Sequence, residues 1–125
     1  MQTLYERIGG ETAFATLVQE FYRGVSEDEL LKPMYPPEDM AGAERRLKMF
    51  LEQYWGGPKT YQEERGHPRL RMRHSVFPIG PQARDAWLGH MRRAVEALDL
   101  SQADEAELWD YLERAAHAML NRFAD

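Results

Sequence analysis

Residues 65–74 of the chain read Arg-Gly-His-Pro-Arg-Leu-Arg-Met-Arg-His. The proline at position 68 suits the first position of a helix, where its missing N–H is not needed. A helix over residues 68–75 would be about two turns long, and it would align Leu70, His74 and Phe77 along one side. The segment therefore predicts a short helix that presents a single histidine beside apolar side chains.

Outside this segment, clusters of glycine and proline divide the chain into stretches whose apolar residues recur every three or four positions. This spacing is typical of amphipathic helices, and no stretch reads as a convincing strand. Helices are expected over residues 11–25, 40–54, 82–98 and 102–122. The fold class predicted from this pattern is all-α.

Individual polar residues refine the helix predictions. Asp39 is expected to cap the helix over residues 40–54. Ser101, followed three residues later by Asp104, resembles a capping box for the last helix. In the helix over residues 40–54, four charged residues are expected mostly to face water: Glu44, Arg45, Lys48 and Glu52.

Composition limits the classes of protein to consider. The chain has 125 residues, enough for a single domain over residues 1–125, and a formal net charge of −5, which is the wrong sign for a dedicated nucleic-acid binder. It contains no cysteine, which excludes disulfides, iron–sulfur clusters and thiolate-bound metals. The first ten residues lack the apolar core of a signal peptide, and no later run is long enough to span a membrane. We therefore expect a cytoplasmic protein that does not bind membranes.

The histidines are the candidate metal ligands. None of the four has a partner at the spacing of a helical zinc or di-iron site. Haem iron needs only one protein ligand, because the porphyrin supplies four nitrogens. His74 shares its side of the short helix with apolar residues, and Arg71 and Arg73 beside it could meet the haem propionates. A histidine in such a place is more often an ordinary core or surface residue, and the ligand role could instead fall to His67, His90 or His117.

Three polar aromatic residues lie on the apolar stripes or in the loop that follows the first stripe: Tyr22, Tyr35 and Trp87. Such residues normally fill a core, and phenylalanine would serve there as well. If they converge on one pocket, their O–H and N–H groups would donate to a ligand that acquires negative charge. The spacing alone does not decide between these readings.

Several fragments in a fixed order resemble the truncated haemoglobins, and within them the bacterial group II proteins. They are Tyr5–Gly10, Phe21–Tyr22, Pro33–Pro36, Phe50–Pro58, Arg65–His74 and Ala86–Leu88, so the resemblance covers nearly the whole chain. It implies the truncated globin fold, a two-over-two helical sandwich around haem b with a much reduced first helix. It also implies that loop largely replaces the helix that carries the proximal histidine in larger globins.

The resemblance also assigns roles to single residues. His74 would be the proximal iron ligand, and Tyr22, Tyr35 and Trp87 would form the distal hydrogen-bonding group. The haem pocket would include Ala43, Leu47, Phe50 and Leu51, together with Leu70 and Phe77 beside the proximal histidine. Arg46 and Arg73 are the first choices as propionate partners, followed by Tyr61 and His67.

Three functions follow as alternatives. The first is a haem protein that binds oxygen, and also NO and CO, with slow release caused by the distal donors. The second is a redox enzyme, an NO dioxygenase or a peroxidase, which would need a separate reductase because the chain has no flavin or nicotinamide motif. The third is a haemless helical interaction module. Exposed faces of the last two helices would also allow a homodimer.

Overall fold

The computed structural model describes residues 2–122, and it contains helices but no strand in that range. The α-helices are α1 (Leu4–Ile8), α2 (Gly10–Val25), α3 (Met40–Tyr54), α4 (Thr60–Arg65), α5 (Leu70–His74), α6 (Pro81–Glu96) and α7 (Gln102–Ala118). Two single 3₁₀ turns, Lys32–Met34 and Pro37–Asp39, connect α2 to α3. No helix in the described residues has both the length and the apolar character that a bilayer span requires.

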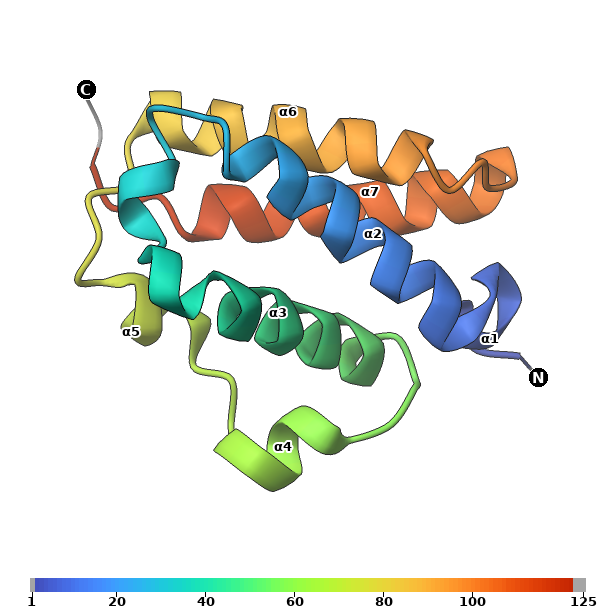
Figure 1. Ribbon diagram of the computed structural model, residues 1–125. Helices are drawn as coiled ribbons and strands as arrows, with labels where there is room; N and C mark the ends of the chain where they lie inside the picture. The colour runs from blue at the N-terminus through green and yellow to red at the C-terminus, as the bar shows by residue number, and fades with distance from the viewer. Residues whose placement is uncertain (1, 123–125) are drawn as a thin grey trace.

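The four long helices form two layers. Helices α6 and α7 run side by side in one layer, and α2 and α3 form the other (Figure 1). Helix α2 packs against both α3 and α6, so it links the layers. Phe14, Leu17 and Phe21 of α2 are completely buried, together with Met91 of α6 and Leu108 of α7. Of the shorter helices, α1 and α5 lie at opposite ends of the sandwich, and α4 lies beside α3 (Figure 1).

The predicted long helices are present, with some differences at their ends. Helix α3 has the predicted bounds, and α2 and α6 each begin one residue earlier than expected. Helix α6 ends at Glu96 rather than at residue 98. Helix α7 ends at Ala118 rather than at residue 122. The chain leaves the helix there because the backbone N–H groups of Asn121 and Arg122 both donate to the carbonyl of Ile79, at 2.9 and 3.0 Å.

The prediction for the short helix was wrong at its N-terminal end. Helix α5 begins at Leu70, and Pro68 lies outside it. The residue between them, Arg69, has φ 45° and ψ 52°, a left-handed conformation that a right-handed helix cannot contain. Arg69 is therefore the N-cap, and His74 is the last residue of the helix.

The predicted caps had mixed outcomes. Ser101 caps α7 as expected, since its hydroxyl accepts a hydrogen bond from the Asp104 N–H at 3.2 Å. The carboxylate of Asp104 instead pairs with Arg7 of α1, at 3.0 Å. Asp39 occupies the N-cap position of α3 as predicted, but its side chain accepts no hydrogen bond from the N–H groups of the helix. Its carboxylate lies 2.6 Å from the guanidinium of Arg46 instead.

Glu52 was also predicted incorrectly. The residue is only 6% exposed, although its place in the sequence suggested the water face of α3. Its carboxylate lies 3.5 Å from Lys48, one turn earlier on the helix. Burial raises the pKa of Glu52 above its ordinary value, because a carboxylate is less well solvated inside a protein than in water.

Helices α2 and α6 lie close together where Gly24 faces His90 and Arg93. A methyl group added at Gly24 would overlap the His90 ring and lie 2.7 Å from Nη2 of Arg93. Neither side chain is free to move away. His90 is paired with Asp28, at 2.6 Å, and Arg93 donates to the backbone carbonyl of Glu20, at 2.8 Å.

We expect the substitution Gly24→Ala to lower the free energy of unfolding by about 1–3 kcal/mol, because overpacking forces helices or side chains apart. Gly89→Ala in α6 is the matched control, since a methyl group there would meet no atom within 4 Å. Alanine in an open helical position should stabilise by roughly 0.5–1 kcal/mol. Urea denaturation followed by circular dichroism measures both, and equal effects of the two substitutions would contradict the close approach.

Candidate functional site

Residues of all four long helices and of α5 line a cavity of about 650 Å³. Its size lies in the range of small-molecule and cofactor sites. Apolar side chains from several helices supply most of its wall, including Phe50 and Leu51 of α3, Leu112 of α7, and Leu31 and Phe77 from connecting segments. The cavity therefore suits a large, flat and mostly apolar group.

The structure brings nearly all of the predicted site residues together around this cavity. Thirteen of them line it: Tyr22, Tyr35, Ala43, Arg46, Leu47, Phe50, Leu51, Tyr61, Leu70, Arg73, His74, Phe77 and Trp87. His67 does not line the cavity. It is exposed, and its Nδ1 accepts a hydrogen bond from the Arg69 N–H at 3.1 Å.

His74 is held in one orientation by its own helix. Its Nδ1 lies 2.7 Å from the carbonyl oxygen of Leu70, one turn earlier. A carbonyl only accepts, so Nδ1 donates, and in the neutral imidazole the lone pair is then on Nε2. Within residues 2–122, no hydrogen bond to Nε2 is found. The imidazole can therefore bind a metal through Nε2 without losing its anchor.

Tyr22, Tyr35 and Trp87 form one polar group inside the apolar wall. The rings of Tyr22 and Tyr35 meet edge to face with centroids 5.5 Å apart, and the Tyr22 hydroxyl donates to the backbone carbonyl of Ala43 at 3.4 Å. Burial raises the pKa of both tyrosines above its ordinary value. Their hydroxyls therefore stay protonated, and can donate, throughout the neutral pH range.

Comparison with known proteins agrees with this geometry. Residues 3–121 match the family model described as bacterial-like globin. The Group 2 truncated hemoglobin YjbI of Bacillus subtilis is 43% identical over 118 residues, which are 94% of this chain and 88% of the relative. The chain belongs to the bacterial-like globins, as a group II truncated haemoglobin.

Solved structures of truncated haemoglobins share the fold. The thermostable hemoglobin of the actinobacterium Thermobifida fusca is 57% identical, with a TM-score of 0.94 over 96% of this chain and 98% of that one. The truncated oxygen-avid haemoglobin of Bacillus subtilis is 42% identical, with a TM-score of 0.89 over 96% and 100% of the two chains. The family and the two-over-two globin fold predicted from the sequence are confirmed. The chain is a globin whose ligand chemistry depends on haem.

The residues of this truncated haemoglobin fit a haem group. In the described residues, no cluster of three or more histidine, cysteine or acidic side chains could hold a metal ion alone, so a metal there would need other donors. A porphyrin supplies four nitrogens, and His74 offers a fifth. The apolar wall suits the ring, and the arginines at the rim suit its two propionates.

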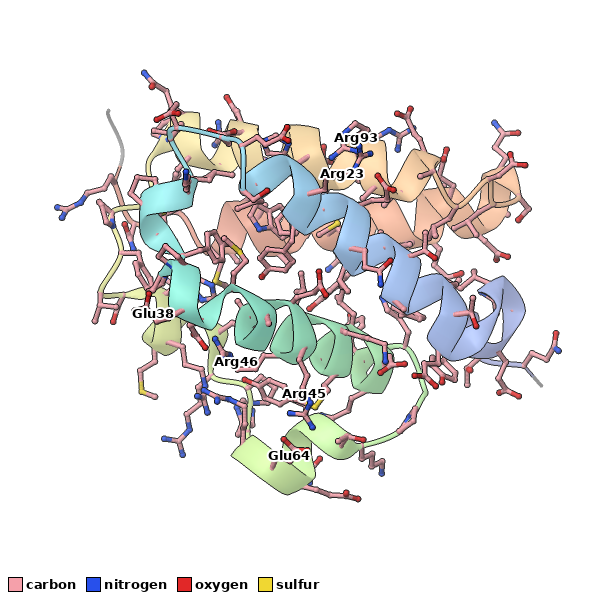
Figure 2. All side chains as sticks on the ribbon, viewed as in Figure 1. Arg23, Glu38, Arg45, Arg46, Glu64 and Arg93 are labelled. Carbon is pink, nitrogen blue, oxygen red and sulfur yellow. The ribbon has the colours of Figure 1, made fainter. Side chains whose placement is uncertain are left out.

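The rim arginines are held by the protein itself. Arg46 pairs with Asp39, and Arg73 donates to the carbonyls of Pro68 and Arg65, at 2.7 and 3.2 Å. Figure 2 shows Arg45 and Arg46 on α3. Arg45 donates two hydrogen bonds to the carboxylate of Glu64 on α4, at 2.8 and 2.7 Å. That pair ties α4, and with it the cavity residue Tyr61, to α3.

Sequence reasoning missed Asn121, which positions the segment after His74. Its amide nitrogen donates to the carbonyls of Phe77 and His74, at 2.9 and 3.4 Å, and its oxygen accepts from the Ile79 N–H at 2.8 Å. The predicted helix extended beyond this residue and would have left its side chain in water. The only available signal was an asparagine near a helix end, which is common for many reasons.

Sequence reasoning also missed the contribution of α7 to the cavity. The lining residues of this helix and its C-cap are Tyr111, Leu112, Ala115, Ala116 and Met119. Their spacing predicted an ordinary core stripe. A helix face that packs on a cofactor and one that packs on other helices have the same apolar pattern, so the sequence could not distinguish them.

A hydrogen bond between two side chains joins the segments that supply Tyr35 and Trp87. His90, one turn beyond Trp87 on α6, lies 2.6 Å from Asp28 in the turn after α2. The other carboxylate oxygen of Asp28 accepts from the N–H groups of Leu30 and Leu31, at 2.8 and 3.3 Å. The hydrogen bond to His90 and the two backbone bonds hold the pKa of Asp28 below its ordinary value.

We expect Asp28→Asn to lower the free energy of unfolding at pH 7 by about 1–3 kcal/mol. A carboxyl whose pKa is depressed in the folded protein stabilises it above the unfolded pKa, near 3.9, and that contribution is lost as pH falls through the folded pKa. The difference between wild type and variant should therefore shrink below about pH 4. Asp110→Asn is the control, because its pair with Arg114 is 66% exposed on both sides. A difference that stays constant down to pH 2 would contradict this assignment.

Proposed function

We propose that this truncated haemoglobin holds haem b through Nε2 of His74 and binds dioxygen, NO and CO, with slow release of dioxygen. Haem, when bound, would supply an iron that can take both the His74 imidazole and a diatomic ligand. The observation that carries the proposal is the presence, in one cavity, of a histidine with an unoccupied Nε2 and a group of buried donors.

The donors explain slow release. A bound dioxygen carries partial negative charge, and a hydrogen bond to a charged acceptor contributes about 1.5–3 kcal/mol. Each such bond slows dissociation by about tenfold or more, since 1.4 kcal/mol corresponds to a factor of ten. The Bacillus subtilis relative is oxygen-avid, which supports the same property here. Slow release does not suit oxygen storage, which requires easy unloading.

The rim residues would retain the haem. Arg46 and Arg73 offer guanidinium groups to the propionates, and Arg46 would exchange its contact with Asp39 for one with a propionate. The hydroxyl of Tyr61 lies in the same wall. His67, outside the cavity wall, is the weakest of the four proposed propionate partners.

A redox activity of the same site, as an NO dioxygenase or a peroxidase, is the second candidate. It is favoured by the buried donors, which would position an oxidant, and it needs an external electron donor. The haemless module does not fit a member of the globin family. The cytoplasmic location, the single domain over residues 1–125 and the homodimer stay predictions from the sequence.

We expect His74→Gly to lose the axial ligand that wild type shows when titrated with hemin, because glycine has no side chain to replace the imidazole. The Soret spectrum should shift to that of weakly held hemin, and added imidazole should restore the wild-type spectrum. His117→Gly, at an exposed position of α7, should change neither. An unchanged spectrum in His74→Gly would transfer the ligand role to His67, His90 or His117.

We expect the double substitution Tyr22→Phe, Trp87→Phe to accelerate dioxygen dissociation by at least about tenfold, since it removes two donors from the cavity. Stopped-flow displacement of dioxygen by CO measures this rate. Tyr54→Phe is the control, because Tyr54 is 48% exposed and does not line the cavity. Equal rates in wild type and the double variant would count against the role of these donors.

A further inference from the structure

The segment that contains His74 has an unusual charge. Between Glu64 and Asp85 the chain has five arginines and no acidic residue, although its formal net charge is −5. Two of the five are engaged within the protein, Arg73 with backbone carbonyls and Arg84 with Asp85 at 3.0 Å. A third, Arg65, lies over the ring of Tyr61. These three arginines therefore already have contacts within the protein.

The other two, Arg69 and Arg71, face solvent. Both are exposed, and no carboxylate within residues 2–122 pairs with either. Neither lines the cavity. Their charge is consequently available to a partner, whereas most arginines elsewhere on the protein are already paired with a carboxylate.

Two large, exposed apolar side chains follow these arginines in the sequence. Met72 is 58% exposed and Val76 is 78% exposed, the highest values among the exposed large apolar residues of the described chain. Met72 is two residues from His74, so it lies on the other side of α5 from the cavity. We call Arg69, Arg71, Met72 and Val76 the α5 surface. An apolar centre with a charged rim is the usual anatomy of a protein–protein interface.

The α5 surface is held in a fixed shape. Arg69 adopts its left-handed conformation with its N–H bonded to His67, and such a conformation is unusual for a residue other than glycine. At the C-terminal end of α5, the side-chain amide of Asn121 donates to the carbonyls of His74 and Phe77. A surface that is already ordered loses less conformational entropy on binding.

We propose that the α5 surface is the docking site for an acidic electron-donor protein. The inference rests on the proposed function, because ferric haem must be reduced before it binds dioxygen, and the chain has no motif for a flavin or nicotinamide. The donor's reduced cofactor gives up one electron and the ferric iron accepts it, with no bond formed. Docking on α5 places the donor against the helix whose last residue is His74. Exposed arginines select an acidic partner by charge complementarity.

The test uses the ferric haem-loaded protein and reduced flavodoxin, an acidic one-electron donor, as the probe. We expect the second-order rate of reduction in wild type to fall as ionic strength rises. The double substitution Arg69→Glu, Arg71→Glu should lower that rate at low salt by about tenfold or more, because steering is lost. The control, Lys32→Glu with Lys59→Glu, removes the same charge from two other exposed positions and should change the rate by less than about twofold.

A second measurement needs no electron transfer. Oxidised flavodoxin titrated into the CO-bound protein should shift the NMR signals of the α5 surface in wild type and the lysine control, and not in the arginine variant. Three results would each overturn the proposal. They are equal reduction rates in wild type and the arginine variant, an equal loss of rate in the lysine control, and no shift of the NMR signals in wild type. So would binding of the α5 surface to phosphatidylglycerol vesicles but not to flavodoxin. An intact Soret band and CO spectrum show that the haem function stands, so failure of docking and failure of haem binding are distinguishable.

Discussion

The hydrogen bond between Nδ1 of His74 and the carbonyl of Leu70, 2.7 Å long, is the contact on which the site depends. It fixes the tautomer, so that Nε2 has the lone pair, and it fixes the ring relative to α5. The donor and acceptor belong to one short helix, and the ring therefore moves with that helix. Whatever positions α5 also positions the proposed metal ligand.

A five-residue helix cannot position itself, because a helix of this length is unstable alone. Helix α5 is held from both ends. Arg73 reaches back to the carbonyls of Pro68 and Arg65, and Asn121 reaches in from the chain after α7. The early end of α7 at Ala118 is part of this arrangement, since a longer helix would carry Asn121 away from the carbonyls it satisfies.

These facts explain what the sequence could and could not predict. The periodicity of α3 gave both its ends correctly, and single residues such as His74, Tyr22 and Trp87 were correctly expected near one cavity. Glu52 was expected to face water, and Asp39 was expected to cap α3 with its side chain. The burial of Glu52 and the pairing of Asp39 with Arg46 both arise from tertiary packing, which the local sequence does not show. The role of Asn121 depends on a chain segment more than forty residues away.

The polar groups of the cavity also show how it stays ready for a ligand. Burying two hydroxyls and an indole N–H costs free energy unless each finds a partner. Here the Tyr22 hydroxyl donates to the Ala43 carbonyl at 3.4 Å, so this donor has a partner before any ligand arrives. A ligand must therefore attract the hydroxyl away from that carbonyl. A ligand that gains negative charge would compete better than a neutral one, so this bond would favour dioxygen over CO.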